Sequence, residues 1–163
     1  MQSIRIAPLD YHSAEQRDAL VELLASYADD PAAGSGDGLS SEARASVIAG
    51  LRDHPKSLVL MAFDGGTPVG VAVCFEGYGT FAARPLINLH DLVVAPTARG
   101  RGVGGRLLEA VEAEARRRGC CFVTLEVSGQ NTGAQRLYRR HGFVGGASID
   151  PPHAMMFWKK PLA

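Results

Sequence analysis

The sequence has few cysteines, and their arrangement argues against the two structural roles that cysteines most often have in small proteins. The three are Cys74, Cys120 and Cys121. Their number is odd, and two of them are adjacent, so they do not indicate a disulfide framework. The sequence contains no Cys-x-x-Cys or Cys/His pattern that would indicate a zinc site. We therefore expect three free cysteines that serve as packing residues, and a functional site that uses no metal.

The chain also lacks an excess of charge of either sign. It has 17 basic and 17 acidic residues, so its formal net charge is zero. A neutral chain is not attracted as a whole to nucleic acid or to an anionic membrane, and any anion site must be local. No apolar run is long enough to span a bilayer or has the pattern of a signal peptide. We expect a cytoplasmic protein with no nucleic-acid or membrane partner.

The apolar residues that are present suffice for one core. With 163 residues, 46% of them hydrophobic, the chain is expected to form a single domain over residues 1–163. Helices are predicted from helical spacing of apolar residues, and strands from apolar runs bounded by turn residues. The helices are expected at 14–27, 41–51, 102–118 and, shorter, between Asn131 and Gly142, and the strands at 4–6, 57–63, 67–75, 87–94, 121–127, from 143 onward and at 154–160.

The order of these elements predicts the fold class. Residues 64–66, Asp-Gly-Gly, form a hairpin turn between two expected strands. Hairpins come first along the chain, and strand–helix–strand–helix follows. This order is typical of an α/β (α+β) protein whose mixed sheet is covered by helices on both faces. Residues 29–40 are rich in Gly, Pro, Asp and Ser and are expected to form a loop.

The most informative segment is Arg-Gly-Arg-Gly-Val-Gly-Gly at residues 99–105, between an expected strand and an expected amphipathic helix. Glycines leave backbone N–H groups accessible, and a helix N-terminus carries a positive partial charge. Arg99 and Arg101 add full charges. Together these features predict a phosphate-binding loop. A plain flexible turn with solvated arginines is the alternative that needs no ligand.

A dinucleotide-binding loop is one specific interpretation of this segment. Gly100-x-Gly102-x-x-Gly105 matches the Gly-x-Gly-x-x-Gly pattern, and Glu126 follows at about the twenty-residue distance that the pattern requires. Two features count against an NAD-dependent oxidoreductase. Residues 95–99 separate the first glycine from the preceding strand, and the motif comes too late in the chain for the usual second half of the sheet.

Two motifs in the correct order carry a more specific resemblance. The first, Arg-x-x-Gly-x-Gly at 99–104, follows a strand that ends Leu-Val-Val-Ala-Pro. The second is Asn-x-x-Ala-x-x-Leu-Tyr-x-x-x-Gly-Phe at 131–143. With the strand between them, residues 89–143 resemble the GNAT superfamily of N-acetyltransferases. The resemblance implies the acyl-CoA N-acyltransferase fold, with a mixed, mostly antiparallel sheet of six to seven strands and helices on both faces.

The resemblance also implies transfer of an acetyl group from acetyl-CoA to the primary amine of a small molecule or peptide, by direct attack in a ternary complex. The loop backbone would hold the diphosphate, the edge of the 87–94 strand would hold the pantetheine arm, and the N–H of Leu92 would stabilise the oxyanion. A non-catalytic acyl-CoA sensor is the alternative, and a homodimer is possible. The implied cofactor-binding residues are Leu92, Val93, Val94, Arg99, Gly100, Arg101, Gly102, Val103, Gly104, Gly105, Asn131 and Tyr138.

The reaction also needs groups that move protons. The resemblance assigns Tyr138 as the general acid for the departing CoA thiolate. His90 and Asp91 are the candidates to accept the proton of the amine, directly or through water. Strict strand alternation puts Asn88, His90 and Leu92 on one face and Asp91 on the other, which favours His90. The expected catalytic residues are thus Tyr138, His90, Asp91 and Leu92.

The sequence leaves the amine acceptor unidentified. We expect the acceptor against the first two helices, the 29–40 loop and residues 78–85. The residues that could shape its pocket are Tyr78, Phe81 and Arg84, and those that could attract a cationic amine are Asp10, Asp29, Asp30 and Glu76.

Overall fold

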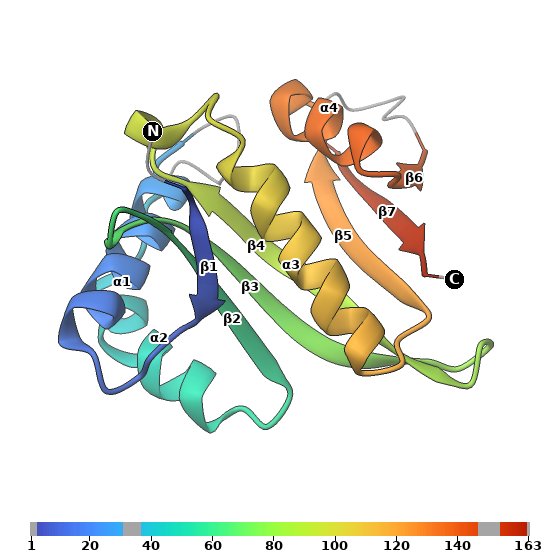
Figure 1. Cartoon of the computed structure of the whole chain (residues 1–163), viewed down its shortest axis with the longest axis horizontal. Coiled ribbons are helices and arrows are strands. Elements are labelled where there is room, and N and C mark those ends of the chain that lie inside the picture. Colours follow the sequence, from blue (N-terminus) through green and yellow to red (C-terminus); the bar gives the residue numbers. More distant parts are fainter. Residues whose placement is uncertain (1–2, 31–36, 147–153, 163) are drawn as a thin grey trace.

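The computed structural model describes residues 3–30, 37–146 and 154–162, and it contains one seven-stranded sheet (Figure 1). The strand order is β1-β2-β3-β4-β5-β7-β6, and every neighbouring pair is antiparallel except β4 and β5. The strands are β1 Arg5–Pro8, β2 Ser57–Asp64, β3 Thr67–Gly79, β4 Arg84–Val94, β5 Phe122–Ser128, β6 Val144–Gly145 and β7 Met155–Pro161. The predicted mixed, mostly antiparallel sheet is confirmed.

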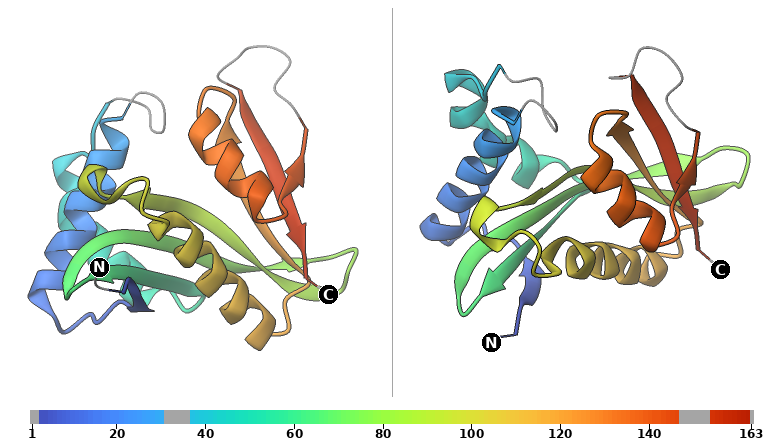
Figure 2. Two further views of the ribbon diagram at one scale, coloured as in Figure 1. Left: turned by 45° about the horizontal axis from the view of Figure 1, so that its top comes forward. Right: turned by 90° about the horizontal axis from the view of Figure 1, so that it is seen from above.

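The helices cover both faces of the sheet, as predicted (Figure 2). They are α1 Ala14–Ala28, α2 Ser41–Asp53, α3 Val103–Arg117 and α4 Thr132–Arg140, with a short 3₁₀ turn at Pro96–Ala98. One apolar cluster joins α3 and α4 to the sheet, and a second joins α1 and α2 to the opposite face. No described helix is both long and apolar enough to cross a membrane.

Local signals in the sequence explain where the helices begin and end. Ser13, Ser40 and Asn131 are N-caps whose side chains each accept a hydrogen bond from a backbone N–H in the first turn. Gly119 and Gly142 follow the ends of α3 and α4 with φ of +70° and +83°, a backbone conformation that favours glycine. These caps match the predicted ends of the helices to within a few residues.

The β3–β4 hairpin is longer than predicted. The two expected strands stopped at residue 75 and began at residue 87, because the apolar pattern ends there. In the structure the ladder continues until Gly79 pairs with Arg84, and Ala83 reverses the chain with φ of +49°. Backbone hydrogen bonds thus extend both strands beyond the residues whose apolar side chains are buried.

Helix α3 lies directly on β3 and β4 because a glycine leaves room for it. The buried stripe of α3 consists of Val103, Leu107, Leu108, Val111 and Ala115, and it confirms the expected amphipathic helix. A Cβ at Gly70 would lie 2.9 Å from the Val93 carbonyl oxygen, 3.2 Å from Val103 and 3.3 Å from Leu107. The start of α3 is thereby held against the end of β4.

We predict that Gly70→Ala destabilises the fold by about 1–3 kcal/mol, since the new methyl group overpacks the α3–sheet contact. Gly50→Ala is the matched control. It lies inside α2 with nothing within 4 Å of the added methyl, and the higher helix propensity of alanine should stabilise it by about 0.5–1 kcal/mol. Urea unfolding midpoints measure both changes, and a Gly70→Ala protein as stable as wild type would contradict this account of the packing.

Candidate functional site

Strands β4 and β5 part after a short paired segment. Only Ile87–Leu89 pair with Val123–Leu125, although β4 continues to Val94 and β5 to Ser128. Beyond this segment β4 pairs only with β3 and β5 pairs only with β7, and β4 and β5 diverge (Figure 2). A cavity of about 630 Å³ opens there, and its walls come from β4, the 99–105 loop, the start of α3 and one face of α4.

On the side of the cavity, the end of β4 has backbone hydrogen-bonding groups that are not paired with a neighbouring strand. The N–H of Ala95 donates to the Val69 carbonyl, so it points toward β3. Backbone groups of an antiparallel strand alternate in direction, so those of Leu92 and Val94 point toward the open edge. There the Arg99 side chain donates from Nε to the Val94 carbonyl at 3.2 Å. Leu92, Val93 and Val94, which the sequence predicts to bind the cofactor, all line the cavity.

A β-bulge in β4 overturns the predicted distribution of side chains. The register with β3 shifts so that Val73 pairs with Asp91 while Cys74 pairs with Leu89, which leaves His90 as the extra residue. Leu92 therefore packs into the α3-side cluster with Leu89. The prediction that Leu92 shares a face with Asn88 and His90 is wrong, because it assumed strict alternation.

His90 and Asp91 lie on the α1–α2 side of the sheet. The His90 ring contacts Phe75 edge-on with 5.6 Å between ring centroids, and Phe75 packs against the α1–α2 cluster. Asp91 is opposite Val73, whose side chain belongs to the same cluster. Burial raises the pKa of Asp91, and the neighbouring His90 acts in the opposite direction. Neither side chain lines the cavity itself.

The glycine loop turns sharply and then starts α3. Gly100 and Gly102 have φ of +75° and +80°, and Gly102 is the N-cap of α3. The helix has no side-chain cap and no acidic residue in its first turn. Its first N–H groups thus lack intrahelical partners and carry the positive end of the helix dipole toward the cavity. The arrangement fits an anion such as a diphosphate.

The next two glycines serve the packing of α3 against α4. A Cβ at Gly104 would lie 3.0 Å from Leu137, and one at Gly105 would lie 3.1 Å from the His141 ring. His141 is itself held by a 3.0 Å hydrogen bond between its Nδ1 and the Leu137 carbonyl oxygen. The close contact between the helices brings one face of α4 beside the α3 N-terminus.

The two loop arginines have different surroundings. Arg99 lines the cavity and is 3.5 Å from Asp30, which also lines it. Arg101 does not line the cavity, because its guanidinium pairs with Asp64 at 2.7 Å beside the β2–β3 turn. The prediction that Arg101 adds charge to the phosphate loop is not supported by this arrangement.

Tyr138 occupies the inner wall of the cavity. It is 7% exposed and its ring packs against Phe143. Burial, together with the nearby Tyr27 and Asp91, raises the pKa of its phenol well above the usual range. The phenol therefore stays protonated at neutral pH and is a hydrogen-bond donor. Asn131, predicted with it, also lines the cavity, where its side chain caps α4.

Several cavity residues are not among those that the sequence predicts to bind the cofactor. Tyr27 and Asp30 come from the end of α1 and the residues after it. Gly133, Leu137 and Arg140 come from one face of α4, and their spacing of four and three residues could have indicated a common face. What the sequence alone could not show is that this face of α4 meets the phosphate loop.

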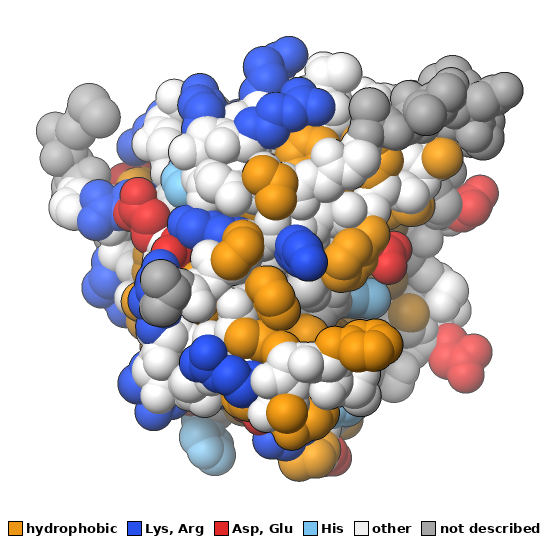
Figure 3. Space-filling view, turned by 90° about the vertical axis from the view of Figure 1, so that its right-hand side faces the viewer, with side chains coloured by type: hydrophobic (Ala, Val, Ile, Leu, Met, Phe, Trp, Pro, Cys, Tyr) orange, Lys and Arg blue, Asp and Glu red, His pale blue; other side chains and the backbone are white. Residues whose placement is uncertain are grey.

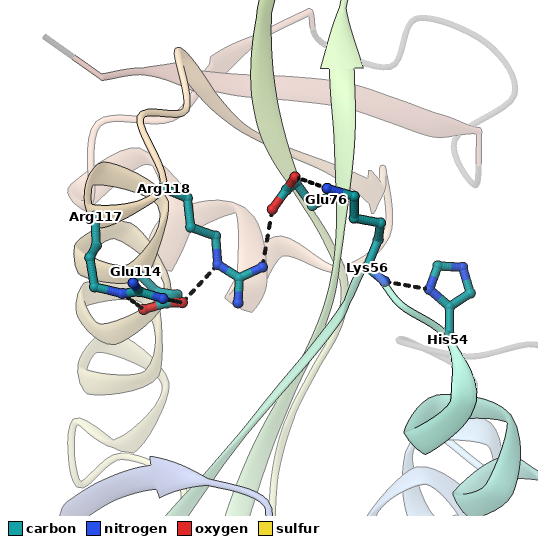
Figure 4. A network of polar contacts seen from close by, with 6 residues as sticks. All are labelled: His54, Lys56, Glu76, Glu114, Arg117 and Arg118. Carbon is teal, nitrogen blue, oxygen red and sulfur yellow. Dashed lines mark hydrogen bonds and ion pairs between the residues drawn. The ribbon is translucent and has the colours of Figure 1, made fainter.

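Four residues proposed for the acceptor pocket lie at the other end of the molecule. Glu76 pairs with Lys56 and Arg118, in a network that Figure 4 shows between β3, the residues after α2 and the end of α3. Arg84 donates to the Gly119 carbonyl beyond the same end of α3. Tyr78 and Phe81 are exposed on the β3–β4 hairpin. The hairpin extends toward the right in Figure 1, the side of the molecule that faces the viewer in Figure 3.

The remaining acceptor candidates are Asp10, Asp29 and Asp30. Asp10 accepts a hydrogen bond from the His12 backbone before α1, and Asp29 caps the end of α1. Of the three, only Asp30 lines the cavity. Residues 31–36 of the expected loop lie outside the described part of the chain.

The cysteines have the packing role that was predicted. Cys74, Cys120 and Cys121 are free and buried. Burial raises the pKa of the Cys74 thiol strongly and that of Cys120 to a smaller extent. Within the described ranges, no three metal-binding side chains come together.

A protein-family model for the acetyltransferase (GNAT) family matches residues 18–143, most of the chain. The chain belongs to the GNAT family of acetyltransferases. The match confirms the resemblance carried by the two motifs, and it identifies the protein as an N-acetyltransferase. A relative in Bacillus subtilis, the uncharacterised N-acetyltransferase YhfO, is 33% identical over 101 residues, which cover 62% of this chain and 67% of YhfO.

Solved structures show the same fold. The ribosomal-protein-alanine N-acetyltransferase of Brucella melitensis aligns over 97% of this chain and 99% of its own, with a TM-score of 0.77 and 23% identity. The YncA protein of Salmonella typhimurium, solved with its cofactor acetyl-CoA, aligns over 99% of this chain and 95% of its own, with a TM-score of 0.75 and 19% identity. The predicted fold class is confirmed.

Proposed function

We propose that this N-acetyltransferase transfers the acetyl group of acetyl-CoA to a primary amine of a small molecule or peptide, by direct attack in a ternary complex. One observation carries the proposal. The open edge of β4, the start of α3 without a side-chain cap, and the Tyr138 side chain all line one cavity. These are, respectively, a backbone edge for an amide-containing arm, an anion site and a proton donor.

We infer one orientation for acetyl-CoA from the placement of these three features. Its diphosphate binds the N–H groups of residues 102–105, which fits the positive end of the α3 dipole. The pantetheine amides bond to Leu92 and Val94 as an added strand would, in place of the bond that Arg99 makes to the Val94 carbonyl. The thioester then lies near the point where β4 and β5 part. The YncA structure, which has the same fold, contains acetyl-CoA.

The chemistry follows from this placement. The amine nitrogen attacks the thioester carbon, and the N–H of Leu92 donates to the developing oxyanion, a contribution of typically about 2.7–4 kcal/mol. The C–S bond then breaks, and the Tyr138 hydroxyl donates to the departing sulfur. Because the pKa of this phenol is raised, the hydrogen bond to the thiolate matters as much as the transfer of the proton.

The amine must lose a proton before it attacks, and we propose Asp91 as the acceptor of that proton, through water. Its carboxyl is close enough to Tyr138 and Tyr27 to raise the pKa of both phenols. Burial raises its own pKa, which makes it a stronger base than an ordinary carboxylate. His90 remains the second candidate, since the bulge leaves it exposed on the same side of the sheet.

Two other functions were open from the sequence. An NAD-dependent oxidoreductase finds no support, since β4 and β5 form the single parallel pair of the described sheet. A non-catalytic acyl-CoA sensor would bind the same ligand in the same cavity. Release of free thiol from acetyl-CoA in the presence of a panel of amines separates enzyme from sensor, and binding without release over the whole panel would favour the sensor.

We predict that Gly102→Ala weakens the binding of CoA about tenfold. An alanine in the left-handed region is strained by roughly 1–2 kcal/mol, so the free loop relaxes away from the binding geometry, and binding must restore it. Gly66→Ala is the matched control, since Gly66 also has a positive φ, of +102°, and an open surrounding, but lies in the β2–β3 turn. It should lower stability and leave CoA affinity unchanged. Calorimetric titration with CoA measures both, and equal affinities in the two variants would place the diphosphate elsewhere.

Tyr138→Phe should lower kcat by about a hundredfold or more while the dissociation constant for acetyl-CoA changes little, since a general acid contributes typically about 10²–10⁴. Thiol release and calorimetric titration supply the two values. Retention of full turnover by the phenylalanine variant would exclude the phenol from the mechanism.

The two candidate bases differ in their effect on the pH profile. If Asp91 accepts the proton, it must be ionised, so kcat/KM falls as the pH drops through a pKa raised above the usual carboxyl range. Asp91→Asn should lower kcat/KM and remove this acidic limb, whereas His90→Gln should keep it. An acidic limb that survives in Asp91→Asn and disappears in His90→Gln would assign the role to His90 instead.

A further inference from the structure

We propose that Arg140 is a phosphate-binding residue of the cofactor site and confers selectivity for a phosphorylated ligand. This inference rests on the proposed binding of acetyl-CoA. Neither of the two sequence motifs includes Arg140 as a motif residue. It is the last residue of α4, and it lines the cavity together with the start of α3.

The charges of the cavity single out this side chain. Among the described residues that line the cavity, three have side chains with a full charge: Asp30, Arg99 and Arg140. Asp30 and Arg99 lie 3.5 Å apart and offset each other. Arg140 makes no ion pair with any described residue and is exposed. The cavity therefore keeps one uncompensated positive charge in a chain whose formal net charge is zero.

The packing of α4 orients Arg140 toward the cavity. The preceding residue, Arg139, places its guanidinium over the Trp158 ring, 4.8 Å from the ring centroid. Successive residues of a helix are about 100° apart around its axis, so Arg140 lies on a different face. That face also contains Gly133 and Leu137, which line the cavity. The contact of Gly105 with His141 holds the same end of α4 beside the first turn of α3.

A guanidinium in this position is suited to a phosphate group. Its planar set of donors matches two phosphate oxygens, and such charge-assisted bonds are about twice as strong as neutral ones. CoA offers two sources of this chemistry, the diphosphate and the 3′-phosphate of its ribose. The helix N-terminus already supplies donors for a diphosphate, and dephospho-CoA, which lacks the 3′-phosphate, distinguishes the two.

The test compares Arg140→Gln with Arg139→Gln by calorimetric titration with CoA and with dephospho-CoA. The variants remove the same charge from adjacent residues, one that lines the cavity and one that packs on Trp158. We expect Arg140→Gln to lose roughly tenfold in affinity for CoA, and Arg139→Gln to bind CoA within about twofold of wild type. Arg140→Lys, which keeps the charge, should recover part of the loss, and urea unfolding verifies that each variant is folded.

Each outcome has a distinct meaning. A loss for CoA but not for dephospho-CoA assigns Arg140 to the 3′-phosphate, and an equal loss for both assigns it to the diphosphate. Unchanged affinity for both ligands in Arg140→Gln, or an equal loss in Arg139→Gln, overturns the inference. Failure of the wild-type protein to bind CoA at all would instead refute the proposed function. These results are therefore distinguishable.

Discussion

The short parallel contact between β4 and β5 is the constraint on which the site depends. Three residues of β4 pair with β5, and after Leu89 each strand continues with a partner on only one side. An unpaired strand edge inside a protein is costly unless something bonds to it. Here the edge borders a cavity, and Arg99 bonds to one of its carbonyls. The bulge at His90 falls at the point of separation, where it also redirects the following side chains.

The proposed anion site is built from backbone and from helix packing more than from charge. Gly100 and Gly102 adopt positive φ, while Gly104 and Gly105 permit α4 to approach α3. The same four glycines thus shape the loop and bring the second wall of the cavity into place. This division of roles explains why a chain without net charge can form a local site for a polyanion.

The sequence was sufficient for the features that depend on local chemistry. The helix ranges and the two motifs depend on patterns within a few residues, and each was predicted. The caps at Ser13, Ser40 and Asn131 lie at the predicted helix starts to within a residue. The bulge at His90 could not, because it is a mismatch between two strands and leaves no pattern in either one. The position of Arg140 on the cavity wall could not be predicted either, because it depends on how α4 packs against α3 and Trp158. The same holds for the ion pair of Arg101 with Asp64, which joins residues far apart in the sequence.

The burial of the three cysteines has a consequence for an enzyme whose proposed second product is a thiol. Thiol–disulfide exchange requires a thiolate that can reach its partner. Cys74, Cys120 and Cys121 are all shielded from solvent, and burial keeps Cys74 and Cys120 in the protonated form. The disulfide that forms when released coenzyme A is oxidised therefore has no accessible thiolate of this protein with which to exchange. Reagents that react with free thiols will report the released coenzyme A and not the folded protein.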